Sequence, residues 1–521
     1  MSSSTAAKLS KNGGSSDTAG VIASGALRSI VGRGAGYLVQ YAFVAACTRA
    51  LGGESSGGVL AVLSLVNIAA VIGRFGLDSC GLREVSVSIG RNDFARARQQ
   101  GLAVLAASGV LSLLILLLVW TFRGFLLDGV GLSSIVAEQL LLLLIPLFTL
   151  TGVLGEMIRA TRRMFASAVT QLILIYMIPV LMLVPVWTGH ESSSFDVFVG
   201  LAFGAGLSLC FGAWIFLRAT RATAQTATLS GTALDRKRLI QGAPHFMAMS
   251  VTTMYLSNID VIAVSRFLGQ SDVAVYVACT RTAMVISLGL IGIGGILAPY
   301  FASAYATQNT RRLTSLVNAG ARWCAFQGLV VATFLLILAR PILSIFGEGF
   351  DQFTVVLAVL ILGQFINTAF GPLAVLLSMT HRERVGAVIL IVTAILGTAA
   401  YLIMIPRFGL IGAALANMSV VIIWNFSMAW LAWQRLESGA PYLRIGIAIS
   451  LLLPVWFADN VFDMTQVSVV LFAAAGIVLM TLVAWFLVLT SQDRIVFVQF
   501  VHSLVGQKRN EHMKDVRDQV K

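Results

Sequence analysis

Thr48-Arg49-Ala50-Leu51-Gly52 and Ser265-Arg266-Phe267-Leu268-Gly269 share one pattern: a small hydroxyl residue, arginine, an apolar residue, leucine and glycine. Each stretch ends one long apolar run and precedes the next, so each marks the turn of a predicted hydrophobic hairpin. The two arginines lie 217 positions apart (266 − 49). This spacing predicts a duplicated helical bundle, an arrangement from which many membrane transporters are built.

The composition of the chain decides its environment. Of its 521 residues, 58% are hydrophobic and 11% are charged, and the mean hydropathy is +0.88. A soluble chain of this length would expose far more charge. Apolar stretches of about 20 residues, each long enough to cross roughly 30 Å of hydrocarbon as a helix, recur along the whole sequence. The sequence therefore predicts an all-α polytopic membrane protein.

The pattern of apolar runs predicts fourteen transmembrane helices. They are 25–48, 57–77, 100–121, 136–156, 166–187, 195–217, 245–265, 272–298, 318–339, 353–377, 385–405, 409–432, 444–458 and 466–489. Most lysines and arginines fall in alternate connections, and the other connections hold only Arg49, Arg123, Arg266, Arg340 and Arg407. Because positive charge is retained on the cytoplasmic side, both termini are predicted to be cytoplasmic. The same bias explains the net charge of +13 without nucleic acid as a partner.

The repeated turn divides the chain into lobes. We expect two pseudo-symmetric six-helix lobes at 21–218 and 243–433, joined by a small, polar cytoplasmic linker at 219–242. An appended helix pair is expected at 443–490. The Ser/Gly-rich segment 1–20 is expected to be a disordered cytoplasmic tail, and 491–521 a second cytoplasmic tail.

Charges inside the first span are candidates for function, because a charge in a membrane helix is costly. Arg33, Tyr37 and Gln40 are spaced i, i+4, i+7 and share one helical face. The glycines around them, Gly32, Gly34 and Gly36, permit an alternative interpretation. They are equally typical of a close contact between helices, with no ligand involved.

The second lobe carries the other candidates. Asn258 and Asp260 lie in the span 245–265, and Arg281 lies about nine residues into the next span, or roughly 13 Å deep. Thr253, Ser257 and Asp260 have the spacing of one helical face. Asp260 and Arg281 are expected to form either a structural ion pair or part of a polar site that faces a central cavity.

The sequence lacks the motifs that are typical of several classes of enzyme. It has no phosphate-binding GxxxxGK[ST] loop, no HExxH and no GxSxG nucleophile elbow, and no large loop carries an acidic cluster. The five cysteines have no metal-ligand spacing. We therefore expect no enzyme activity, no metal and no cofactor, apart from a coupling proton or Na⁺.

The amino-acid sequences of the two hairpins resemble those of a known group of membrane proteins. The matching stretches are TRALGGESSGGVLAVLSLVNIAAVIGRFGLDSCGLREVS, beginning at Thr48, and SNIDVIAVSRFLGQSDVAVYVACTR, ending at Arg281. The chain resembles the polysaccharide-transporter (Wzx-type) branch of the multidrug/oligosaccharidyl-lipid/polysaccharide exporter superfamily, over residues 20–490. One departure is that Ala274 and Val275 stand in the second repeat where the first has Gly57 and Gly58.

The resemblance implies a flippase of the bacterial inner membrane for undecaprenyl-pyrophosphate-linked oligosaccharides, used in the biosynthesis of surface or exported polysaccharide. It implies two lobes around a central cationic cavity that work by alternating access, with Arg33 and Arg281 in the positions of cavity cations. The partners implied are the polyprenyl-linked glycan, the bilayer, and polysaccharide polymerase and export proteins.

Three alternatives remain open from the residues. A cation-coupled multidrug antiporter of the same superfamily is one, favoured by Asp260 and disfavoured by two arginines and no acid in the first span. A flippase for a peptidoglycan lipid precursor would differ mainly in the head group of its substrate. A membrane glycan polymerase or ligase would need a large periplasmic loop that bears catalytic residues, and the predicted loops are short.

Overall fold

The computed structural model describes residues 4–124, 135–183, 193–221, 247, 250–379, 383–434, 466–491 and 493–494. All regular elements in these ranges are helices. Nine helical segments of this part are long and apolar enough to cross a membrane, and two of them, Val31–Arg74 and Val385–Trp433, contain two passes each. The expected all-α polytopic membrane fold is confirmed.

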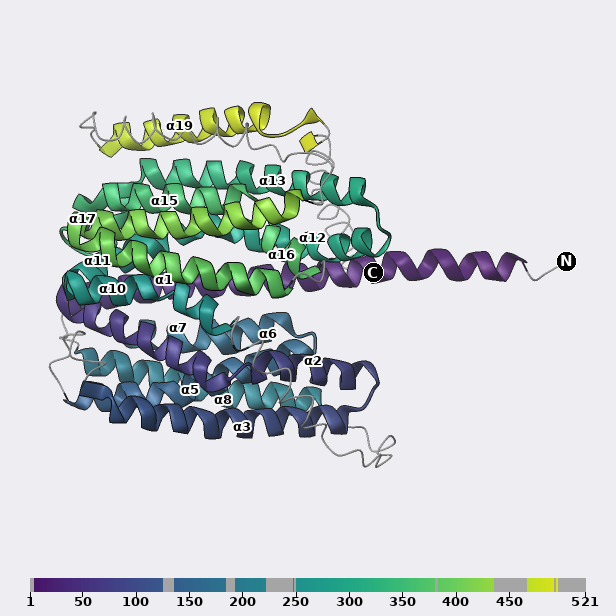
Figure 1. Ribbon diagram of the computed structural model, residues 1–521, viewed down its shortest axis with the longest axis horizontal. Coiled ribbons are helices and arrows are strands. Elements are labelled where there is room, and N and C mark those ends of the chain that lie inside the picture. Colours follow the sequence, from purple (N-terminus) through teal and green to yellow (C-terminus); the bar gives the residue numbers. More distant parts are fainter. Residues whose placement is uncertain are drawn as a thin grey trace, which may run out of the picture.

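The first lobe contains eight described elements, and the first of them, α1, includes both helices of the first hairpin. In chain order they are α1 (Ser4–Arg74), α2 (Leu77–Gly90), α3 (Phe94–Thr121), α5 (Ile135–Ala160), α6 (Met164–Ala168), the π-helical turn η1 (Val169–Ile173), α7 (Leu174–Leu183) and α8 (Ser194–Ala219). They form the lower half of Figure 1. Pro179 lies inside α7, the helix that directly follows the π-helical turn.

The second lobe forms the upper half of Figure 1. Its elements are α10 (Ile259–Phe267), α11 (Gln270–Met284), the 3₁₀ turn η3 (Val285–Ser287), α12 (Leu288–Ala306), α13 (Thr310–Ile337), α14 (Ala339–Ser344), η4 (Phe350–Phe353), α15 (Thr354–Ala369), α16 (Leu373–Met379) and α17 (Glu383–Trp433). The appended helix α19 (Gln466–Leu487) packs on α13 at the outer edge.

Glycines in the left-handed region form the hairpin turns. Gly52 has φ 74° and ψ 176° and divides α1 into the two expected spans, and Gly409 with φ 58° divides α17 in the same way. Gly269, at the matching position of the second repeat, has φ 122° and ψ 178°. A side chain would strain such a backbone, so the repeated glycine is required by conformation.

The duplication extends beyond the hairpins. α3 and α13 each have 28 residues, and their N-cap residues Asp93 and Asn309 are 216 positions apart (309 − 93). Each cap side chain accepts a hydrogen bond from the backbone of an arginine three residues on, at 3.0 Å and 2.9 Å. Each cap follows a residue with positive φ, Asn92 or Gln308. The lobes therefore share local turn chemistry as well as length.

Helix α1 begins at Ser4, within the segment 1–20 that was predicted to be a tail, and projects out of the bundle (Figure 1). Extending an existing helix adds hydrogen bonds without a new nucleus. The connection after the second span was expected to be a loop, but it contains the helix α2, which follows a sharp turn at Phe75 and Gly76.

Other expectations concern residues outside the described part of the chain, so the structure does not test them. The expected helix 444–458, residues 222–242 of the expected linker and most of the tail 491–521 lie outside the described residues. The described part of the tail includes Asp493, which pairs with Arg322 of α13.

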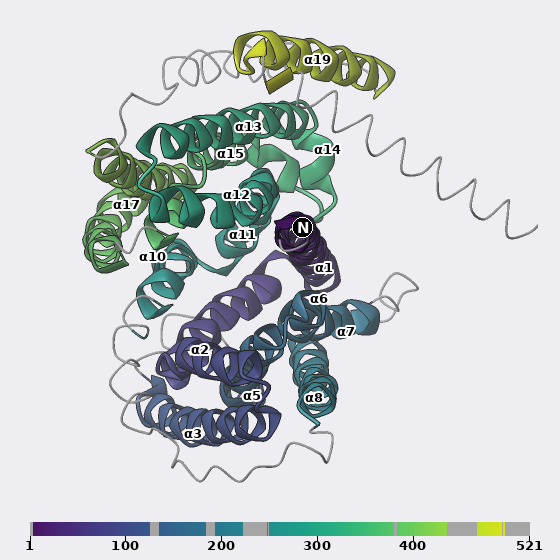
Figure 2. The same ribbon diagram turned by 90° about the vertical axis from the view of Figure 1, so that its right-hand side faces the viewer.

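α1 lies between the two lobes (Figure 2). It contacts α11 and α12 of the second lobe and α5, α6 and α7 of the first. One continuous apolar core includes fully buried side chains from both lobes, among them Phe43, Phe198, Tyr276 and Phe365. α1 and α11 therefore form the seam on which any site between the lobes is built.

Candidate functional site

A polar recess of about 340 Å³, partly open, lies at the seam between the lobes. The first lobe supplies Gln40, Ser64 and Asn67 from α1 and Tyr176 from α7, and the second lobe supplies Arg281 from α11. The hydroxyl of Tyr176 interacts with the side chains of Gln40 and Asn67, and with the charge of Arg281. One cation therefore faces a set of neutral hydrogen-bonding groups across the seam.

A second recess of about 330 Å³ adjoins the first. Tyr37, Gln40 and Tyr41 line it from α1, and Arg281 and Met284 line it from α11. Gln40 and Arg281 border both recesses. The recess thus brings together three residues that were predicted from the sequence. Tyr37 and Gln40 come from the first lobe, and Arg281 comes from the second.

The guanidinium of Arg281 is available to a ligand. The residue is half-buried, and its Nη1 lies 3.5 Å from the sulfur of Met284. Among the described residues, no carboxylate lies within ion-pair distance of it. Because a half-buried cation without a counter-charge attracts anions, the recess favours a negatively charged group.

Arg33 does not line either recess. It is exposed, one helical turn from Tyr37 on the same face of α1, or about 6 Å nearer the N-terminus. Its neighbours Gly32 and Gly36 pack on α6 and η1: an added Cβ would lie 3.0 Å from Ala168 and 2.8 Å from Leu172. The glycines thus serve a helix contact, and Arg33 lies beside it on a free face.

Asp260 is buried in a separate cluster. Its Oδ2 accepts hydrogen bonds from the Tyr276 hydroxyl at 3.1 Å and the Asn417 amide at 3.3 Å, and its Oδ1 accepts one from the Val261 N–H at 2.9 Å. The Asn417 amide also lies 3.4 Å from the Tyr401 hydroxyl. All these partners are neutral, and Arg281 acts on the carboxylate only at longer range. The side chains form a connected polar network inside the second lobe.

The helical face predicted around Asp260 is interrupted. The helix ends in a turn at Ser257 and Asn258, and α10 starts at Ile259. Thr253 and Ser257 are exposed, whereas Asn258 and Asp260 are buried. The Asn258 side chain donates to the Met254 carbonyl at 2.9 Å. The i, i+4, i+7 spacing therefore fails here, because it holds only for an unbroken helix.

Sequence reasoning missed Ser64, Asn67 and Tyr176. Ser64 and Asn67 are three residues apart within an otherwise apolar span, a spacing that places both on one face. That signal was available, since polar side chains are rare in such a run. Tyr176 carried no comparable signal, because its partners lie more than a hundred residues away in α1 and α11.

A second group of charges holds the first lobe together. Arg74 at the end of α1 donates to the Phe148 carbonyl at 3.1 Å and lies 3.8 Å from Asp78 of α2. Glu156 pairs with Arg159 at 3.0 Å and accepts a hydrogen bond from Gln171, in the π-helical turn, at 3.2 Å. These contacts join α1, α2, α5 and η1 within one lobe and do not reach the seam.

Two helical lobes with a polar recess at their seam define the class of fold: a polytopic helical membrane protein built from two packed bundles. Solved structures share this fold. The lipid II flippase MurJ, in an inward closed conformation, is 14% identical over 88% of this chain and 97% of that chain, with a TM-score of 0.65.

Two multidrug transporters are also similar in fold. An inward-facing multidrug resistance MATE transporter of the MOP superfamily is 15% identical over 81% of this chain and 96% of that chain, with a TM-score of 0.57. A Vibrio cholerae MATE transporter is 14% identical over 80% and 97%, also with a TM-score of 0.57. At these identities the likeness shows the fold alone. Among curated proteins, none matches the chain.

Family models identify the chain more closely. The model of the polysaccharide biosynthesis protein family matches residues 22–305, which is more than half of the chain. The MatE model matches residues 244–402 of the second lobe. The chain belongs to the polysaccharide biosynthesis protein family, and the resemblance seen in its sequence is confirmed.

Proposed function

We propose that this protein flips a polyprenyl-diphosphate-linked oligosaccharide across the bacterial inner membrane by alternating access. The observation that carries the proposal is the seam recess, where Arg281 of one lobe faces Gln40, Asn67 and Tyr176 of the other. A ligand bound there would touch both lobes at once. Its binding energy would therefore depend on how the lobes are arranged, which is what alternating access requires.

The chemistry of the recess suits such a head group. Diphosphate oxygens need charge and hydrogen-bond donors to replace lost water, and an arginine fork binds two of them at once. Carboxamides and hydroxyls, such as those of Gln40, Asn67 and Tyr176, suit sugar hydroxyls as well. We propose that Arg33, exposed on the same face, contacts the head group on its way to Arg281. The polyprenyl tail can stay in the lipid.

We further propose that a proton or Na⁺ bound at Asp260 couples to transport. An ionised carboxylate that is buried among neutral partners is costly, and binding a proton or a cation removes that cost. Asn258 and Asp260, predicted from the sequence to bind substrate, line neither recess. Asp260 therefore fits an ion better than a head group. Imposing a Na⁺ gradient, a pH gradient or a potential separately on proteoliposomes would distinguish the driving forces.

The cellular role follows from the substrate. We propose that the protein supplies lipid-linked repeat units to polysaccharide polymerase and export proteins outside the cytoplasmic leaflet. In a deletion strain, completed repeat units should accumulate on the inner leaflet and be removed from it when the gene is restored. Normal glycan with altered drug sensitivity would instead support a cation-coupled multidrug antiporter, and accumulation of peptidoglycan precursor would support a precursor flippase.

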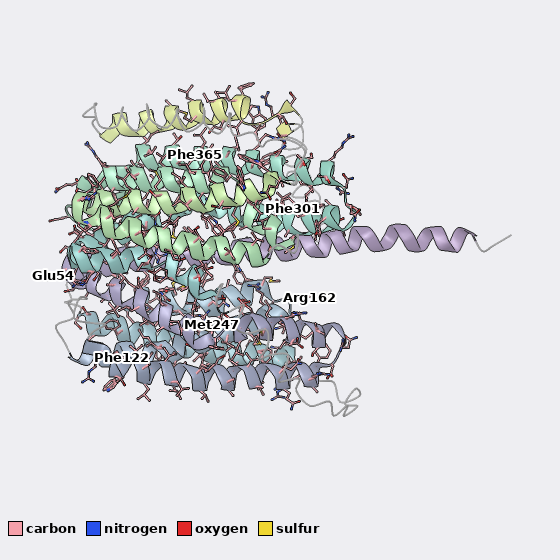
Figure 3. All side chains as sticks on the ribbon, in the orientation of Figure 1. Glu54, Phe122, Arg162, Met247, Phe301 and Phe365 are labelled. Atoms are coloured by element: carbon pink, nitrogen blue, oxygen red, sulfur yellow. The ribbon has the colours of Figure 1, made fainter. Side chains whose placement is uncertain are left out.

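The proposed orientation places both termini in the cytoplasm. Glu54 near the first hairpin turn and Arg162 between α5 and α6 lie at opposite ends of the bundle (Figure 3). In a Cys210→Ser background, which removes the exposed thiol, a cysteine at Glu54 should react with an impermeant maleimide in intact cells. A cysteine at Arg162 should react only after the membrane is opened. The reverse pattern would refute the orientation.

A further inference from the structure

One arginine of the repeated turn has a role that the recess does not explain. Arg49 belongs to the few cations on the predicted periplasmic side, where arginine is disfavoured. Its Nε donates to the Ile345 carbonyl at 2.7 Å, and its Nη2 donates to the Ser344 carbonyl at 3.1 Å. Arg49 lies in the first lobe and both carbonyls lie in the second, 295 and 296 residues away.

We propose that Arg49 is the latch of a clasp that holds the lobes together on the face opposite the N-terminus. The clasp consists of Arg49 and Tyr41 of α1 with Ser344, Ile345 and Phe346 at the end of α14. Releasing it is a step in opening that face.

The acceptors suit a cation. Ser344 is the last residue of α14, and Ile345 follows as its C-cap. Carbonyls at a helix C-terminus lack intrahelical partners and carry partial negative charge, so a nearby arginine is favourable there. The planar guanidinium reaches two successive carbonyls at once, which an ammonium cannot do with the same fixed geometry.

Aromatic packing forms the other half of the clasp. The ring of Tyr41 meets the ring of Phe346 edge-on, with centroids 5.1 Å apart, and Phe346 stacks on Phe350 at 6.2 Å. Phe346 is fully buried. The intervening backbone turns through Gly347 and Gly349, with φ of 140° and 81°. This loop therefore presents one aromatic side chain and two carbonyls to α1.

The clasp stands where the two hairpins already touch. A Cβ on Gly57 would collide with the backbone oxygen of Gln270, so the two hairpins approach so closely that only glycine fits at this position. Gly53 is also close, with Ser271 at 3.8 Å from its Cβ position. For a ligand to leave the seam recess by this face, α1 and α11 must separate, and the clasp must break when they do.

The test measures the separation of the lobes directly and does not depend on the substrate. In full-length protein in lipid nanodiscs, with Cys210→Ser, spin labels are placed at Phe122→Cys and Asp351→Cys. Both positions are exposed. Phe122 lies in the first lobe at the same end of the bundle as Glu54 (Figure 3), and Asp351 lies in η4 of the second lobe, next to Phe350. Electron–electron double resonance then gives the ratio of closed to open molecules.

Arg49→Ala should lower the closed-to-open ratio about three- to tenfold, since these charge-assisted bonds are exposed and hence weakened by water. Arg49→Lys should lie between it and the wild type. Tyr41→Leu should also lower the ratio, and by more than Tyr41→Phe, which keeps the ring and loses only the contact of the hydroxyl with Thr282. The matched control is Arg407→Ala, an exposed arginine beside the Gly409 turn.

Two results would overturn the clasp. One is an unchanged ratio in both Arg49→Ala and Tyr41→Leu. The other is an equal shift in Arg407→Ala, which would indicate a general effect of charge on that face. Failure of the substrate proposal would leave these distances unaffected, so the two proposals fail separately.

Discussion

The two hairpins at the seam share the same turn but differ in the helix that follows the turn and in the side chains that they supply to the recess. Gly52 and Gly269 both combine positive φ with extended ψ, and no atom lies within 4 Å of the Cβ position of either glycine. The chain after Gly52 continues as one helix to Arg74, whereas the chain after Gly269 is broken by the 3₁₀ turn Val285–Ser287. Duplication has thus preserved the turn and not the helix that follows it.

The side chains differ in a way that matters for function. The first hairpin supplies neutral polar groups to the recess, including Gln40 and Asn67, and the second supplies the charge of Arg281. Gly57 of the first hairpin permits contact with the backbone of Gln270, while Ala274, at the matching position of the second hairpin, carries a side chain and is fully buried. The asymmetry is therefore concentrated at the seam, where one lobe must fit against the other.

The largest expected effect comes from removing this asymmetry at Gly57. In Gly57→Ala the new methyl group would overlap the Gln270 carbonyl, a backbone atom that cannot rotate away. Overpacking of this kind costs about 1–3 kcal/mol, or more where backbone is involved. We expect a marked fall in the yield of monodisperse protein and in its thermal midpoint.

The matched control is Gly34→Ala, in the same helix, where no atom lies within 4 Å of the Cβ position. It should preserve both yield and midpoint. A Gly57→Ala protein as stable as Gly34→Ala would show that the hairpins do not need to approach so closely.

The next effect concerns the charges of the second hairpin. Arg281→Ala should reduce flipping at least tenfold at normal protein levels, and Arg281→Lys should retain part of it, because lysine keeps the charge and loses the fork. Asp260 has neutral partners, so removing it should not rescue Arg281→Ala. Recovery of flipping in the Asp260→Ala, Arg281→Ala double mutant would instead mark a structural ion pair. Protein yield is measured alongside transport.

The smallest effect lies away from the seam, at the appended helix. Asp493 after α19 accepts two hydrogen bonds from Arg322 of α13, at 2.6 Å and 3.1 Å. Burial acts to raise the pKa of Asp493, but the hydrogen bonds from Arg322 and Thr490 outweigh it and the pKa lies below its usual value. The stabilisation is therefore present above about pH 4, and is lost as the pH falls through the lowered pKa.

Asp493→Asn should lower the thermal midpoint at pH 7, by the equivalent of about 1–2 kcal/mol. The gap between variant and wild type should narrow as the pH falls below about 4, because the wild-type carboxylate is then progressively protonated. A gap of the same size at neutral and at acidic pH would show that the carboxylate charge is not what anchors α19. Flipping should change little, because the anchor does not touch the recess.

Much of the fold could be predicted from the sequence. Apolar run length and loop charge are local signals, and the repeated glycine turn marks where each lobe begins. The helix α2 was missed because its buried residues include Asp78, Cys80 and Ser88, so it has no clean apolar stripe. Its packing against α3 and α5 supplies partners that the local pattern cannot reveal.

The site was only partly predictable. Helical spacing identified Tyr37 and Gln40, and depth in the membrane identified Arg281, but none of these signals showed that they share a recess. Asp260 was predicted to share a helical face with Ser257, but the helix is interrupted by a turn at Ser257. Residue spacing alone does not reveal such a turn. Tyr176 could be found only from the packing of α7 against α1.

The central claim is that Arg281 binds an anionic head group at the seam, and direct binding tests it. Native mass spectrometry of the full chain with undecaprenyl diphosphate would compare wild type, Arg281→Ala and Arg266→Ala, an exposed arginine of the second turn. Affinity should be about ten- to a hundredfold weaker for Arg281→Ala, since a hydrogen bond to a charged group contributes about 1.5–3 kcal/mol. Arg266→Ala should bind as the wild type does. Equal affinity of wild type and Arg281→Ala would contradict the account.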